Sequence, residues 1–137
     1  MEKVYIDTNI FLNPILYNIK ISQEAKRSIS FLKKIIKKQV LGITSVLTWD
    51  EFVWIIKKTL GYQLAIEKGK EFLIFPNLKI KNISFSTINR AQDIFLNYNI
   101  RPRDAIHVAC ALEHDINKII SFDGDFDIVK EIERSEP

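Results

Sequence analysis

Hydrophobic positions recur along the chain with two spacings, one typical of helices and one of strands. Residues 24–39 place isoleucine and leucine side chains at helical intervals with lysines opposite, which predicts an amphipathic helix. Similar patterns predict further helices at 46–60, 62–75, 86–98 and 103–115. Short apolar or alternating runs predict strands at 3–7, 40–44, 78–83 and 118–122, and a last short helix or strand at 127–134.

Strands separated by helices indicate an α/β fold, in which a parallel sheet of four to five strands is flanked by helices on both faces. The number of strands depends on whether the short ending EIERSEP forms one. No repeat, low-complexity tract or linker divides the chain, so we expect one domain over residues 1–137. Ser86 is the expected N-cap of the helix at 86–98.

Composition narrows the class of protein. With 137 residues, 47% of them hydrophobic, the chain can bury a substantial core. No apolar run approaches the roughly 20 residues that span a bilayer, and Asp7 interrupts any signal-peptide pattern, so we expect no membrane contact. The single cysteine, Cys110, indicates a reducing cytoplasm and reads as a small buried hydrophobe. The net charge of +3 comes mostly from lysine pairs, which fit solvated helix faces or a diffuse attraction for polyanions.

Acidic residues stand where predicted strands end and predicted helices begin. Asp7 ends the first strand and Asp123 the last, while Glu51 and Asp104 lie in the first turns of two helices. Because the carboxyl ends of parallel strands share one edge of a sheet, we expect these four to meet there. Each also has a local explanation: a turn for Asp7 and for the FDGD segment, a capping box from Thr48 to Glu51, and a helix dipole for Asp104.

Four carboxylates at one edge call for a cation. Two of them about 5 Å apart repel by roughly 3 kcal/mol at an effective dielectric constant near 20. Oxygen ligands suit Mg²⁺ or Mn²⁺, whereas zinc prefers nitrogen and sulfur ligands. His107, His114 and Cys110 all fall in one predicted helix, and His107 reads as a core residue or a support beside the site.

A hard divalent cation among carboxylates commonly activates water against a phosphodiester bond. No serine stands in a recognisable relation to histidine for nucleophilic catalysis, and the four glycines form no phosphate-binding loop. These observations favour a metal-dependent phosphodiesterase.

Four segments taken in order, YIDTNIFLNP, TSVLTWDEFVW, RPRDAIHVACALEHD and KIISFDGDFD, resemble the PIN domain family over essentially the whole chain. The resemblance implies a three-layer α/β/α fold and an Mg²⁺- or Mn²⁺-dependent endoribonuclease. Many family members are VapC-type toxins that a small antitoxin protein neutralises.

The resemblance also assigns roles to individual residues. It implies four catalytic acids, namely Asp7, Glu51, Asp104 and Asp123. It implies metal ligands at Asp7, Asp104, Asp123 and Asp125, supported by Asn9 and Ser121. Asp127 has no firm counterpart in the family and reads as a helix cap.

The sequence also carries expectations about substrate and partners. Arg101 and Arg103 flank Pro102 directly before Asp104, where they would hold RNA phosphates or simply face solvent. As in the family, we expect an RNA substrate, an antitoxin and a homodimer, with segment 52–56 (FVWII) and the helix at 24–39 as candidate contact surfaces. A PIN-like nuclease of RNA maturation and a non-catalytic metal- or RNA-binding module are the alternatives.

Overall fold

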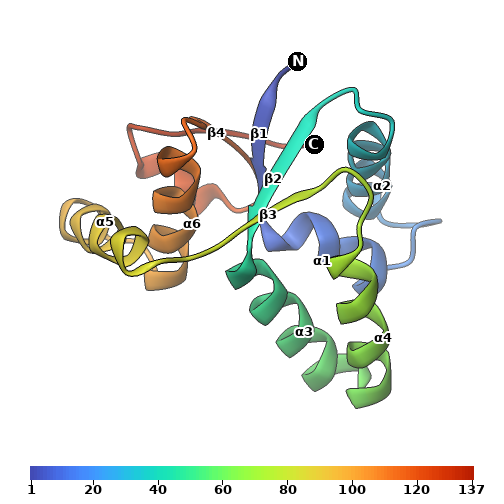
Figure 1. Ribbon diagram of the computed structural model, residues 1–137. Helices are drawn as coiled ribbons and strands as arrows, with labels where there is room; N and C mark the ends of the chain where they lie inside the picture. Colours follow the sequence, from blue (N-terminus) through green and yellow to red (C-terminus); the bar gives the residue numbers. More distant parts are fainter.

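A five-stranded parallel sheet organises the computed structural model, which describes residues 1–137 (Figure 1). Its strands stand in the order β3-β2-β1-β4-β5, so the first strand is central. They are β1 (Lys3–Ile6), β2 (Leu41–Ser45), β3 (Lys79–Lys81), β4 (Lys118–Ile120) and β5 (Glu133–Ser135). The short C-terminal segment therefore does add a fifth strand, and the predicted α/β fold is confirmed.

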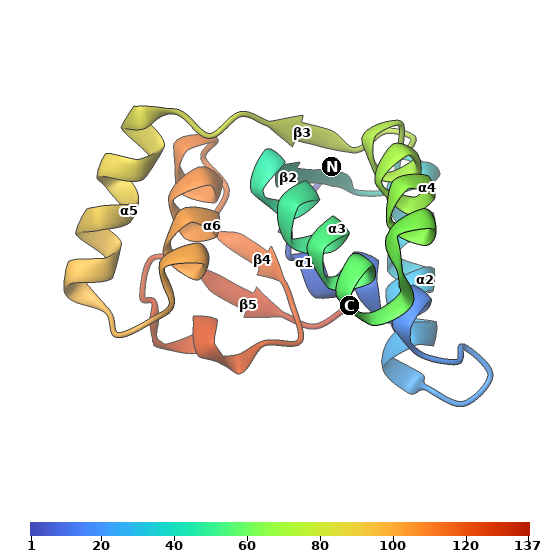
Figure 2. The same ribbon diagram turned by 90° about the horizontal axis from the view of Figure 1, so that it is seen from below.

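Six α-helices cover the two faces of the sheet (Figures 1 and 2). They are α1 (Thr8–Leu16), α2 (Gln23–Ile36), α3 (Val46–Leu60), α4 (Tyr62–Leu73), α5 (Phe85–Asn97) and α6 (Pro102–Glu113). A short 3₁₀ helix, η1 (Gly124–Ile128), follows β4. None of the helices combines the length and the apolar character that crossing a bilayer requires.

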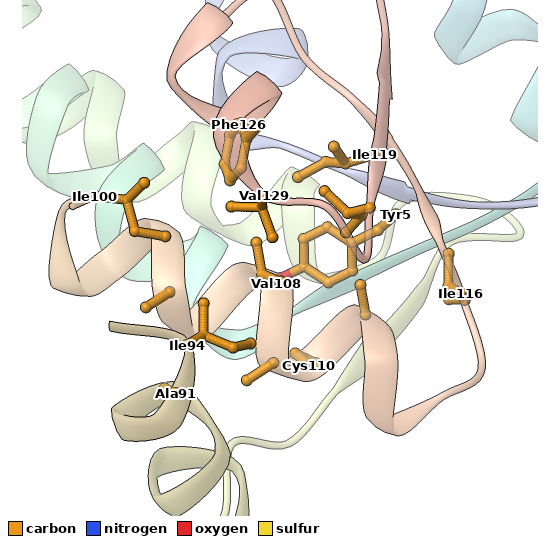
Figure 3. Close-up of a cluster of buried hydrophobic side chains, with 14 of the residues drawn as sticks. Tyr5, Ala91, Ile94, Ile100, Val108, Cys110, Ile116, Ile119, Phe126 and Val129 are labelled. Atoms are coloured by element: carbon orange, nitrogen blue, oxygen red, sulfur yellow. The ribbon is translucent and has the colours of Figure 1, made fainter. Parts of the chain in front are cut away.

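Each face of the sheet carries its own hydrophobic core because side chains alternate along a strand. Tyr5 of β1 points into the core beneath α5 and α6, where it joins Val108 and Phe126 (Figure 3). Its neighbours Val4 and Ile6 point into the opposite core, which α1 to α4 enclose. The central strand is thus buried on both sides, and its end is held firmly between two packed layers.

Two local expectations were incomplete or wrong. Helix α1 was not expected, because its sequence TNIFLNPIL carries polar residues and Pro14; burial of Ile10 and Phe11 in the core stabilises it. Helix α5 begins after Ser84, not at Ser86, because the Ser84 hydroxyl accepts from the Thr87 amide in a capping box.

Candidate active site

The four predicted catalytic acids line one cleft of about 590 Å³ at the carboxyl edge of the sheet. Asp7 follows β1, Glu51 lies in α3, Asp104 in the first turn of α6, and Asp123 shortly after β4. The strand order brings them together, because β1 and β4 are neighbours and the helices after β2 and before β4 start at the same edge.

Asp7 is the most firmly held of these acids. One carboxylate oxygen accepts from the backbone amide of Thr8 at 2.8 Å, so Asp7 also caps α1. The other accepts from the hydroxyl of Ser121 at 2.6 Å and from the side-chain amide of Asn9 at 3.2 Å. Burial raises the pKa of Asp7 above its ordinary value, and the opposing effects of His107 and of Ser121 are smaller. Asn9 and Ser121 therefore both contact Asp7, as expected of supporting residues.

Asp104, Asp123 and Asp125 form a carboxylate group in which one oxygen from each residue lies within 4.8 Å of the others. Asp104 is only 4% exposed, and burial, aided by the charges of Asp7 and Asp123, raises its pKa against the effect of Arg101. Asp7 lines the same cleft but is not part of this group. An all-carboxylate set of oxygens has the chemistry that Mg²⁺ and Mn²⁺ prefer.

The capping box from Thr48 to Glu51, the alternative local explanation of Glu51, does not form. Helix α3 begins after Ser45, which makes no side-chain cap, and the Thr48 hydroxyl instead meets that of Thr44 at 2.7 Å in the interior. The carboxylate of Glu51 is consequently free of its own helix and belongs to the cleft.

A buried hydrogen-bond chain holds Glu51 in the cleft. One of its oxygens lies 2.5 Å from Nε2 of His107 and accepts from the Thr8 hydroxyl at 2.8 Å. On the far side of the imidazole, Nδ1 lies 2.7 Å from the Tyr5 hydroxyl, which donates to Ser45 at 2.9 Å. His107 is fully buried, so it is both a core residue and a support for the site.

The same chain shifts the pKa values of both partners. Burial alone would raise the pKa of Glu51, but its hydrogen bond to His107 and the charge of His107 bring it below its ordinary value. Burial alone would lower the pKa of His107, but the hydrogen bond to Glu51 and the charges of the surrounding acids raise it overall. The two directions agree, because each partner favours the charged form of the other.

Tyr5 and Thr8 belong to this network, and sequence reasoning missed both. Thr8 could have been suspected because it directly follows Asp7. Tyr5 gave no such signal, because a tyrosine within a buried strand reads as core. Its hydroxyl gains a role only because α6 packs on the face of the sheet to which Tyr5 points and brings His107 within hydrogen-bond distance.

Arg101 and Arg103 behave differently from each other. The guanidinium of Arg101 donates from Nε to Asp104 and from Nη2 to Asp123, both at 3.1 Å, so it bridges two site acids. Arg103 is half exposed and approaches only Asp50, at 3.6 Å. Arg101 is therefore paired with two site acids although its side chain is 69% exposed.

Asp127 is not a helix cap, contrary to expectation. Asp123 caps η1 through the amide of Asp125 at 2.9 Å. Asp127 instead accepts two hydrogen bonds from Arg134, at 2.8 and 3.1 Å, and Arg134 also donates to the carbonyl of Ser121. The pair fastens β5 beside the segment that carries the site.

Fold and site together define a three-layer α/β protein with an acidic cleft at the carboxyl edge of its sheet. The sequence pattern of the PIN domain family matches residues 4–132, and the chain belongs to that family. The expected family resemblance is thereby confirmed.

Individual relatives agree with this assignment. The chain is 27% identical to ribonuclease VapC2 of Methanocaldococcus jannaschii over 137 residues, which cover 91% of this chain and 87% of that protein. The crystal structure of VapC20 from Mycobacterium tuberculosis, a toxin that cleaves the sarcin–ricin loop, superposes with a TM-score of 0.77 at 14% identity, covering 98% of this chain and 99% of VapC20. A toxin–antitoxin complex from Klebsiella pneumoniae gives a TM-score of 0.66 at 22% identity, covering 98% of this chain and 99% of that chain. The two structural likenesses establish the fold.

Proposed function

We propose that this protein is a metal-dependent endoribonuclease, the toxin of a type II toxin–antitoxin pair, which hydrolyses RNA phosphodiester bonds with Mg²⁺ or Mn²⁺. The observation that carries the proposal is the meeting of four acids from distant parts of the chain in one cleft. Three carboxylates within 4.8 Å of one another supply a fitting set of oxygens for such an ion. The similarity to ribonuclease VapC2 supports the same activity.

In this proposal Asp104, Asp123 and Asp125 hold the metal, with Asp7 as a further ligand. When bound, the ion polarises the phosphate and lowers the pKa of an attacking water. Asn9 and Ser121 keep the Asp7 carboxylate in place through the hydrogen bonds that they donate to it. All of these oxygens come from rigid elements or their ends, which limits the reorganisation that catalysis would otherwise require.

Glu51 acts on the water. Its lowered pKa keeps it a carboxylate at neutral pH, so it can accept a hydrogen bond from the nucleophile. His107 and Thr8 hold it by one oxygen, which leaves the other oxygen for the cleft. Arg103 lines the same cleft and contacts the RNA backbone there. Arg101 does the same when its guanidinium is released from Asp104 and Asp123.

The decisive experiment measures cleavage of a panel of RNAs with Mg²⁺, with Mn²⁺ and with EDTA. We expect Asp104→Asn to reduce metal-dependent cleavage to background while the protein stays folded, because the variant removes a ligand and relieves repulsion. Asp50→Asn is the matched control, since Asp50 is an exposed acid next to Glu51 in α3 that does not line the cleft and approaches only Arg103. Full cleavage by Asp104→Asn would contradict the proposal.

The outcome also separates the alternatives. Binding of Mn²⁺ without cleavage of any RNA would support a non-catalytic binding module. Cleavage of a single precursor RNA, with no gene for a small DNA-binding protein upstream, would support a role in RNA maturation.

We further propose an antitoxin partner and a homodimer of one-domain chains, residues 1–137, in the cytoplasm. The toxin–antitoxin complex from Klebsiella pneumoniae, with the same fold, supports a protein partner. Within segment 52–56, Trp54 is half exposed and lines the cleft, whereas Phe52 and Ile56 are buried, so Trp54 is the candidate contact there. Co-purification of a small protein and light scattering of the purified chain test these two partners.

A further inference from the structure

Arg101 occupies an unusual position for the residue at the start of a helix. It is the N-cap of α6, and its guanidinium turns back over the first turn to reach Asp104, three residues on. The same guanidinium also donates a hydrogen bond to Asp123, which lies shortly after β4. It has no other hydrogen-bond partner, and its side chain is 69% exposed.

Arg101 hydrogen-bonds to carboxylate oxygens of Asp104 and Asp123 that a metal would also use as ligands. Oδ1 of Asp123 already accepts from the amide of Asp125 at 2.9 Å, and Oδ2 is the atom that Arg101 holds at 3.1 Å. Oδ2 of Asp104 accepts from Arg101 at 3.1 Å as well. A guanidinium offers only donors and a permanent positive charge, so it cannot be a ligand of a divalent cation and competes with one for the same carboxylate oxygens.

We propose that Arg101 is an internal counter-ion of the site, which the divalent metal must displace from Asp104 and Asp123 before it binds. This inference rests on the proposed function, because it concerns the same site. Displacement needs no change in the backbone, since the exposed side chain can rotate away while the helix start stays in place. The freed guanidinium then faces the cleft, where it meets a phosphate of the RNA. One residue thus offsets part of the negative charge of the empty site and contributes to substrate binding in the loaded site.

Metal titration without RNA tests the competition directly. We expect Arg101→Gln to bind Mn²⁺ at least about tenfold more tightly than the unmodified protein in calorimetry, within the range usual for coupled binding events. Arg101→Lys should fall between them, because lysine keeps the charge but cannot bridge two carboxylates with a planar fork. Arg103→Gln removes the same charge two residues away and contacts neither acid, so it should tighten binding much less.

Two results would overturn the inference. One is an Arg101→Gln variant that binds Mn²⁺ as weakly as the unmodified protein or more weakly, which would mean that Arg101 only orients the acids. The other is an equal gain in Mn²⁺ affinity in Arg103→Gln, which would mean that the change in net charge alone causes the effect.

Thermal unfolding gives a second, independent measurement. In EDTA, Arg101→Gln should unfold at a lower temperature than the unmodified protein, because the acids lose their counter-ion. In saturating Mn²⁺ the gap should close or reverse, since tighter binding stabilises the folded state more. A gap that stays the same with and without Mn²⁺ would contradict the competition. If Arg101→Gln does not fold in EDTA, the titration of Arg101→Lys decides.

Failure of this inference can be told from failure of the proposed function. Tighter Mn²⁺ binding by Arg101→Gln with no RNA cleavage by any form supports the competition and removes the ribonuclease proposal. Cleavage that depends on Mn²⁺, together with equal Mn²⁺ affinities, overturns the competition alone. Absence of Mn²⁺ binding in every form overturns both.

Discussion

Replacing His107 with leucine removes the shortest hydrogen bond of Glu51 and leaves its mostly buried carboxylate without its hydrogen-bonded cationic partner. The His107 side chain is 0% exposed and that of Glu51 15% exposed. Breaking a buried ion pair from one side costs about 3–5 kcal/mol. Glu51 keeps the Thr8 hydroxyl and some contact with water, so we expect a loss near the lower end, about 3 kcal/mol in the free energy of unfolding. At about 0.3 kcal/mol/K of unfolding entropy for 137 residues, that corresponds to about 10 °C in Tm.

The loss should depend on pH in a defined direction. The raised pKa of His107 contributes stability that is fully present below its unfolded value of 6.5 and disappears as the pH rises through the folded value. The lowered pKa of Glu51 contributes stability that is present above its unfolded value of 4.5 and disappears as the pH falls through the folded value. The pair therefore contributes most between pH 4.5 and 6.5, and the difference between the two proteins should be largest there.

Urea unfolding in EDTA at pH 5.5 and at pH 9 measures this difference without metal. His107→Gln is the informative companion variant, because its amide can still donate to Glu51 but carries no charge. The double variant His107→Leu with Glu51→Gln should recover part of the loss, since it leaves no unpaired carboxylate. Equal stability of His107→Leu and the unmodified protein at pH 5.5, or a larger loss at pH 9 than at pH 5.5, would refute the ion pair as the cause.

Further predictions concern single positions in the core and beside the site. Gly42→Ala should cost about 1–3 kcal/mol in urea unfolding, because a Cβ there would lie 2.8 Å from Cδ1 of the fully buried Ile35; an unchanged midpoint would contradict this. Ser121→Ala should weaken Mn²⁺ binding about tenfold or more, since Asp7 loses its 2.6 Å hydrogen bond, and unaltered affinity would argue against Asp7 as a ligand. Cys110 should resist thiol reagents at pH 8 until the protein unfolds, because burial raises its pKa to about 11. Rapid labelling of the folded protein would contradict that expectation.

Much of the architecture could be predicted because periodicity is local information. Helix α3 begins and ends where its pattern predicted, and each expected strand lies within two residues of an observed one. The helix caps were harder to predict. Ser84 and Ser86 are both suitable N-cap residues, and only the backbone geometry decides that Ser84 caps α5. Helix α1 escaped prediction for the opposite reason: its local signals are weak and its stability comes from packing against both α2 and α3.

The meeting of the acids could be inferred from chain order, but their individual partners could not. Asp7, Asp104 and Asp123 follow strands or open helices at one edge of a parallel sheet, which is a property of the topology. Which oxygen receives which hydrogen bond depends on side chains that approach from other elements. His107 and Glu51 are 56 positions apart, and Arg101 and Asp123 are 22 apart.

The amino-acid sequence by itself therefore determined the α/β class and the edge at which the acidic residues gather, because the succession of strands and helices along the chain and the side-chain periodicity carry that information. Its four matching segments carried the resemblance to the family. Only the tertiary structure decided that His107 hydrogen-bonds to Glu51 and to Tyr5. It likewise decided that Arg101 bridges Asp104 and Asp123. Hydrogen bonds form within about 3 Å, and distances of that size between remote residues are set by packing of the whole fold.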